Sequence, residues 1–180
     1  GGAAVMLLLA ALFFVLVPNS PPPSSPPATP YPDSGSIIVL QATDLQAQAG
    51  DGSPARPVND FQQVLPRYQL QTGSGTAQLG IVQQEGDGKV YLASHTAVVL
   101  TQLASAQPGE EKHIVISVQQ GQVLVSTQPT SLKYTLRFGK NFDANLLPGA
   151  GGAIGVVTDA ARTFVDCLVG ECQVAINGTE

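Results

Sequence analysis

The sequence predicts an all-β domain, solenoid-like or sandwich-like, that stands behind one N-terminal transmembrane helix and a proline-rich linker. Three observations lead to this prediction: residues 1–17 are uniformly apolar, residues 18–36 are rich in proline, and apolar residues within 37–180 recur with a period of two. An apolar run without a polar stripe fits lipid, proline prevents regular helix and sheet, and period-two alternation is typical of strands with one buried face.

The first segment, residues 1–17 (GGAAVMLLLAALFFVLV), is predicted to cross the membrane as a helix. A full span needs about 20 apolar residues, so we expect the apolar run to continue upstream of Gly1. The alternative is the apolar region of a signal peptide, for which residues 17–20 (VPNS) form a poor cleavage site. No Lys or Arg flanks the run on its C-terminal side, and charge therefore does not fix its orientation.

The second segment, residues 18–36, contains eight of the chain's 14 prolines. We expect a polyproline-II-like spacer that rises about 3.1 Å per residue and holds a domain on the order of 50–60 Å from the bilayer. A ligand for a proline-recognition domain is the alternative interpretation of the same composition.

The third segment, residues 37–180, carries the strand pattern, with inward-facing rows at Ala77, Leu79, Ile81; at Ile114, Ile116, Val118; and at Leu132, Tyr134, Leu136, Phe138. Asp87-Gly88 precedes Val90 and Leu92 and predicts a hairpin turn. We also expect a tight turn at residues 119–121 (QQG), and one helical turn within residues 41–48.

The stretch 59–103 resembles the core of FecR-type domains. That family has a strand ending in Thr-Gly, a small polar turn, an Ala-x-Leu strand, an Asp-Gly turn, a Val-x-Leu strand and a Thr that opens the next strand. The matching residues here are Thr72-Gly73, Ala77 and Leu79, Asp87-Gly88, Val90 and Leu92, and Thr96. Residues 114–125, the Gly-rich approach at 151–156 and a terminal hairpin at 163–176 resemble later parts of the family, although Ala153-Ile154-Gly155 stands where Arg-Gly-Thr is usual.

The resemblance implies an extracytoplasmic, strand-rich domain behind a single membrane helix. Regulatory members of the family relay signals across the membrane to a sigma factor through a cytoplasmic N-terminal segment. Other members occur in envelope proteins, so the domain alone does not imply regulation.

Cys167 and Cys172 are the only cysteines, and they bracket four residues between two expected strands. Directly opposed strand residues lie within the Cα separation that a disulfide requires. We therefore expect a structural disulfide across a hairpin in an oxidising compartment, with free thiols or a metal or redox pair as alternatives.

The remaining candidates are better explained as structural residues. His95 and His113 lack further metal ligands at recognisable spacing, and the neighbours Ser94 and His95 would point to opposite faces of a strand. The acids Glu85, Asp87, Glu110 and Glu111 fit solvated turns better than a calcium loop. Residues 149–155 (GAGGAIG) lack the helix of a phosphate loop, and Asn177-Gly178-Thr179 fits a turn as well as a glycosylation sequon.

These observations predict no catalytic, cofactor-binding or metal-binding residue and no cofactor. A net charge of −5 argues against nucleic acid as a partner. With only 12% charged residues, the chain resembles a domain partly covered by other proteins. We predict a single-pass membrane protein whose extracytoplasmic β domain binds other membrane or envelope subunits, with lipid contacting residues 1–17. The alternatives are a FecR-like signal transducer and, given the absence of Trp, less readily a cell-wall glycan binder.

Overall fold

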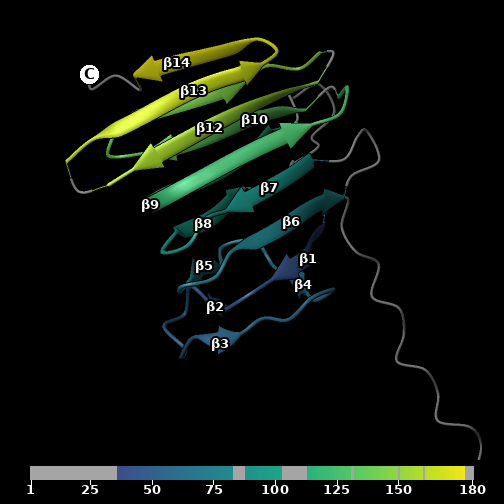
Figure 1. Cartoon of the computed structure of the whole chain (residues 1–180), viewed down its shortest axis with the longest axis vertical. Helices are drawn as coiled ribbons and strands as arrows, with labels where there is room; N and C mark the ends of the chain where they lie inside the picture. Colours follow the sequence, from purple (N-terminus) through teal and green to yellow (C-terminus); the bar gives the residue numbers. More distant parts are fainter. Residues whose placement is uncertain are drawn as a thin grey trace, which may run out of the picture. The chain divides into compact units, whose positions relative to one another are not determined.

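The computed structural model describes residues 36–82, 88–102, 113–130, 132–149, 151–159 and 161–176. Every helix or strand within these ranges is a β-strand, which confirms the all-β class (Figure 1). The expected transmembrane helix and all of the expected linker except Ser36 lie outside these ranges. The described part contains no helix that is long and apolar enough to cross a membrane.

Fourteen strands make up the described part. They are β1 (Ser36–Ala42), β2 (Leu45–Gln48), β3 (Arg56–Pro57), β4 (Gln63–Val64), β5 (Gln69–Thr72), β6 (Ala77–Val82), β7 (Gly88–Leu92), β8 (Ala97–Gln102), β9 (His113–Thr127), β10 (Lys133–Phe138), β11 (Phe142–Leu146), β12 (Gly152–Thr158), β13 (Thr163–Val169) and β14 (Cys172–Ile176).

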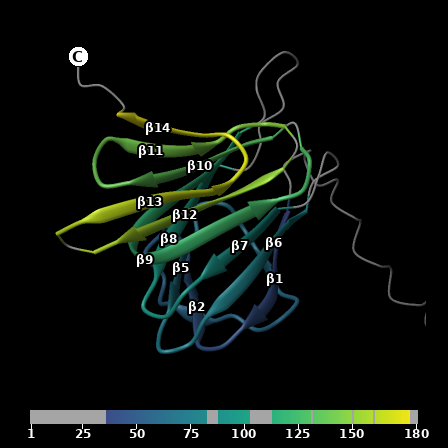
Figure 2. The same ribbon diagram turned by 45° about the horizontal axis from the view of Figure 1, so that its top comes forward.

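The long strand β9 organises the sheet, because its two halves pair with different neighbours. Residues 113–120 lie between β8 and β10, whereas residues 121–127 lie between β7 and β12. One half of the sheet runs β3-β2-β5-β8-β9-β10-β11-β14, and the other runs β4-β1-β6-β7-β9-β12-β13. The result is a curled, half-barrel sheet whose two halves share β9 (Figure 2).

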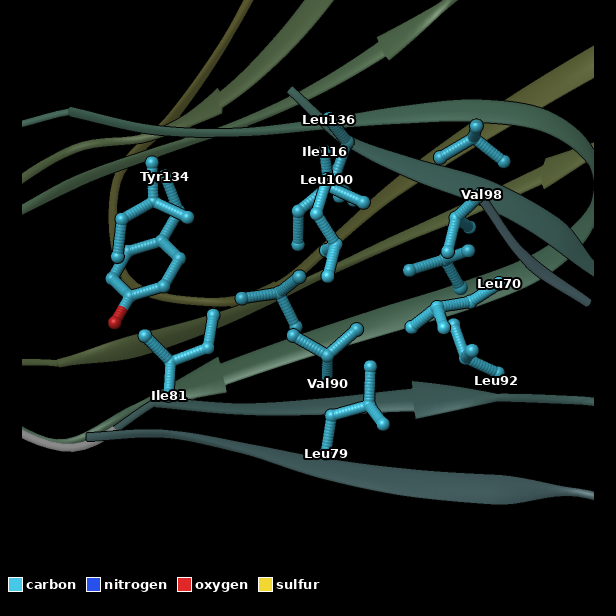
Figure 3. Packing of buried hydrophobic residues seen from close by; sticks show 14 of the residues in the cluster. Leu70, Leu79, Ile81, Val90, Leu92, Val98, Leu100, Ile116, Tyr134 and Leu136 are labelled. Carbon is cyan, nitrogen blue, oxygen red and sulfur yellow. The ribbon is translucent and has the colours of Figure 1, made fainter. Parts of the chain in front are cut away.

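The core lies between the two halves of the curled sheet. Leu100, Ile116 and Leu136 point from one half toward Leu79 and Val90 of the other (Figure 3). Each of these side chains is at least 99% buried. Burying one such aliphatic side chain stabilises the fold by about 1.5–3 kcal/mol. The period-two rows predicted at 77–81, 114–118 and 132–138 therefore form core-facing positions of β6, β9 and the β10 region.

The turn predicted at residues 119–121 is wrong, because β9 runs through this segment without reversing. Gly121 has a φ of +92° and lies against Thr96, so that an added Cβ would come within 2.5 Å of the Thr96 Cα. Only glycine meets both conditions without strain. The Gln-Gln-Gly signal thus corresponds to the point where β9 passes from one half of the sheet to the other.

Two further expectations are corrected. Residues 41–48 form the end of β1 and all of β2 instead of a helical turn, because Leu45 and Ala47 alternate inward with Gln46 outward. The solenoid-like alternative also fails, since solenoids of the β-helix type stack parallel strands. In the described sheet β9 and β10 pair in parallel, while the other strand pairs are antiparallel.

Candidate protein-interaction surface

Strands β13 and β14 end the two halves of the sheet and are together called the C-terminal edge below. Among the described strands β13 pairs with β12 alone and β14 with β11 alone, so each leaves one backbone edge unpaired. Both carry large apolar side chains that are 56–71% exposed: Phe164, Leu168, Val169, Val174 and Ile176. An apolar strand with an unpaired edge is a ready template for another strand.

The opposite edges of the same sheet are protected. Strands β3 and β4 have two residues each, and β3 consists of Arg56 and Pro57. Short length, a charge and a proline are the usual means by which proteins prevent pairing at an edge. By contrast, β13 spans seven residues without proline, Lys or Arg. Within the described residues, the sheet therefore blocks edge pairing at one end and leaves β13 and β14 open at the other.

The register of β13 defines which side chains flank its free edge. Val165 pairs with the fully buried Val156 and so lies on the core side of the strand. Phe164 pairs with Val157, and Asp166 with Gly155, on the outer face. Asp166 is exposed and forms no ion pair with any residue that the structure describes. The outer face beside the free edge thus presents an apolar group and an unpaired carboxylate two residues apart.

The predicted disulfide between Cys167 and Cys172 is present, with Cα atoms 5.9 Å apart. The hairpin predicted around it is wrong: β13 pairs with β12 and β14 with β11, so the two strands belong to different halves of the sheet. The bond therefore joins the ends of the two halves at the C-terminal edge, while Cys172 packs against the core.

The two histidines lie apart. His95 occupies the turn before β8 with a φ of +56°, and no hydrogen bond joins its side chain to that of Ser94. His113 begins β9, where its Nε2 shares a hydrogen bond with the Thr135 hydroxyl, which in turn donates to the side-chain oxygen Oδ1 of Asn145. Within the described ranges no three His, Cys, Asp or Glu side chains gather as metal ligands would.

Most of the other sequence candidates fall outside the residues that the structure describes. Glu85, Asp87, Glu110 and Glu111, and the sequon at 177–179, lie outside the described residues. The Gly-rich segment leads into strand β12 and not into a helix.

Thr72 and Thr96, two positions of the FecR-like pattern, form a fully buried hydroxyl pair. The Thr72 hydroxyl donates to the Ala93 carbonyl at 2.6 Å and accepts from the Thr96 amide at 2.9 Å. The Thr96 hydroxyl accepts from the Gln122 amide at 3.0 Å. These bonds connect β5 and the start of β8 to β9, so the pair has a structural role.

Two surface hollows in the described part are further candidate sites. One, of about 430 Å³, lies on the outer face over β6, β7 and β9 beside Gln78, Tyr91 and Leu124. The other, of about 680 Å³, lies among β2, β3 and β4 beside Arg56, Gln63 and Tyr68. Neither contains a group of side chains that recognisably performs a reaction, and neither shares residues with the C-terminal edge.

Sequence reasoning missed the exposed apolar residues of the C-terminal edge. A signal was present in the adjacent apolar pairs Phe164-Val165 and Leu168-Val169, because neighbouring strand residues point to opposite faces. A strand that is apolar on both faces is either fully covered by its own fold or available to a partner. Searches against protein-family models, curated proteins and solved structures find no match for the chain.

Proposed function

We propose that this protein is a non-catalytic, single-pass membrane subunit whose extracytoplasmic β domain binds other envelope or membrane proteins by strand pairing at the C-terminal edge. The observation that carries the proposal is that β13 and β14 expose apolar side chains and that each has one backbone edge without a partner among the described strands. Strand addition provides affinity through main-chain hydrogen bonds and specificity through alternate side chains.

The chemistry of the surface supports a protein partner. Interface cores are depleted of charge and enriched in aromatic and aliphatic groups, and the exposed side chains of β13 and β14 include one acid among several apolar residues. The disulfide ties these two strands together, which reduces the conformational entropy that a partner would have to remove on binding. Only 12% of the residues are charged, which is consistent with a domain that is partly covered by other subunits in its assembly.

Transmembrane signalling to a sigma factor is the second candidate. It is favoured by the buried Thr72–Thr96 pair, which falls at positions of the FecR-like pattern. Because both hydroxyls are buried and stabilise the fold, the pair supports a FecR-like domain more directly than it supports a signalling function.

The test is to extract the full chain from its native membrane in mild detergent and to identify by mass spectrometry what copurifies with it. Phe164→Ser and Val174→Ser should remove partners that bind at constant ratio, because both side chains lie on the C-terminal edge. The matched control is Phe61→Ser, which removes an 80% exposed aromatic from a turn outside β13 and β14. Partners retained by all three variants, or a sigma-type regulator as the single partner, would refute the assembly proposal.

A further inference from the structure

We infer that β13 accepts a strand from a different protein that places a Lys or Arg opposite Asp166 and an apolar residue opposite Phe164. The inference rests on the proposed function and goes further, since it specifies the partner's chemistry and favours a different protein over a second copy of the chain at this edge. It is carried by the register of β13 together with the charge along that strand.

The side chains on the outer face of the sheet determine which residues an added strand must carry. Tyr91, Leu124 and Gly155 stand in one cross-strand row that ends at Asp166, and Gln122 and Val157 stand in the row that ends at Phe164. A strand added beyond β13 would extend both rows, with Cβ atoms about 4.5–5.5 Å from those of its opposite residues. At that distance opposite charges attract and like charges repel across the pair.

Asp166 forms no ion pair with a Lys or Arg in the described part of the molecule. Its cross-strand neighbour is Gly155, which offers no side chain, and β13 itself contains no Lys or Arg. The carboxylate is therefore available to a cation from outside. A complementary charge at the free edge would also fix the register of the incoming strand, which apolar contacts alone define only weakly.

A second copy of the chain fits this edge poorly. A symmetric dimer pairs a strand with itself in antiparallel orientation. Centred at Asp166, such a pairing places two carboxylates opposite each other, and centred at Val165 it places each Asp166 opposite Phe164. Centred at Phe164 it places Asp166 opposite Arg162, the residue before β13, but then only residues 163–165 of the two β13 strands lie opposite each other, while residues 166–169 face residues that precede β13. Every register that pairs more of β13 with itself leaves the acid without an opposite cation.

The probe is a pair of fluorescein-labelled, end-blocked seven-residue peptides of valine and threonine, with lysine or glutamate at the centre. Binding to the full chain in detergent micelles is followed by fluorescence anisotropy. We expect the lysine peptide to bind about two- to thirtyfold more tightly than the glutamate peptide, as the attraction in one pair and the repulsion in the other imply. Asp166→Lys should invert this preference, and Phe164→Ser should weaken both peptides.

The matched control is Glu171→Lys, which makes the same charge change at the same end of the molecule but outside β13. It should leave the preference as in the wild type, whereas an inversion there would show that long-range attraction, and not pairing at Asp166, selects the peptide. Equal binding of both peptides, or a wild-type dimer in sedimentation that Phe164→Ser dissociates, would overturn the inference. If both peptides bind equally well and Phe164→Ser still weakens them, the charge inference fails but the proposed function stands. If the native partners still copurify with Phe164→Ser, the proposed function fails as well.

Discussion

Gly121, where β9 passes from one half of the sheet to the other, provides the sharpest test of how the sequence determines this fold. Gly121→Ala adds a Cβ in a residue with φ +92°, and that atom would lie 2.5 Å from the Thr96 Cα. The positive φ costs about 1–2 kcal/mol for a residue other than glycine. Forcing an extra methyl into a packed site costs about 1–3 kcal/mol more. We therefore expect a loss of about 2–5 kcal/mol in the free energy of unfolding.

Two further glycines separate the conformational and steric contributions. Gly52→Ala has a comparable φ of +81° with nothing within 4 Å of the added atom, so it should cost only the conformational part. Gly152→Ala has no positive φ, but its Cβ would lie 2.7 Å from the Val169 carbonyl oxygen, so it should cost only the steric part. Each variant is measured as the full chain in detergent by urea unfolding, followed by far-ultraviolet circular dichroism, with the free energy taken from the midpoint and slope. The reasoning is refuted if Gly121→Ala destabilises the protein no more than Gly52→Ala does.

Three other outcomes follow from the same contacts. Replacing Cys167 and Cys172 by serine should lower the free energy of unfolding by about 2 kcal/mol, as expected for a short loop, and dithiothreitol should then have no further effect on the unfolding midpoint. Thr72→Val should cost about 1–3 kcal/mol because it leaves two buried backbone groups unsatisfied, whereas Thr101→Val, at an exposed hydroxyl, should change stability by less than about 0.5 kcal/mol in the same assay. The backbone amides of residues 161 and 162 donate to the Asp159 carboxylate and lower its pKa from 3.8. The ionised carboxylate therefore stabilises the fold above pH 3.8, and this contribution is lost as pH falls through the lower pKa of the folded state. When the free energy of unfolding is measured against pH in the acid range, its decrease should be shallower for Asp159→Asn than for the wild type, and parallel curves would contradict this.

Local patterns in the sequence predicted individual strands well. Alternation at Tyr134, Leu136 and Phe138 specifies an inward face whatever the partner strand, because side chains on a strand point alternately to opposite sides. The antiparallel pairing of β6 with β7 confirms the predicted hairpin, but Gly88 is wrong as a turn residue, because it begins β7 opposite Ile81 and has no positive φ. Residues 83–87 between the two strands are outside the described part.

Patterns that depend on distant residues were misread. Gln119-Gln120-Gly121 resembles a turn in the sequence, and only the proximity of Thr96 shows why a glycine is needed inside a continuous strand. The spacing of Cys167 and Cys172 fits a hairpin between β13 and β14. These two strands instead pair with β12 and β11, which precede them in the chain. Disulfide geometry constrains only the separation of two Cα atoms and not which strands carry the hydrogen bonds.

The candidate surface could not be located from the sequence because exposure depends on what the fold leaves uncovered. In the sequence, Phe164 and Val165 both resemble core residues. Because β13 is the last strand of its half of the sheet, Phe164 is exposed, whereas Val165 packs against the core. Arg56 and Pro57 at the opposite edge show that this sheet can end in a protected strand. Since protection costs only two or three residues, an unprotected apolar edge is a liability in isolation unless a partner covers it. A proline in β13 distinguishes an edge that binds a partner from an edge that is merely uncovered. If a partner pairs there, the proline should abolish assembly with that partner; if none does, the protein should lose only its tendency to aggregate.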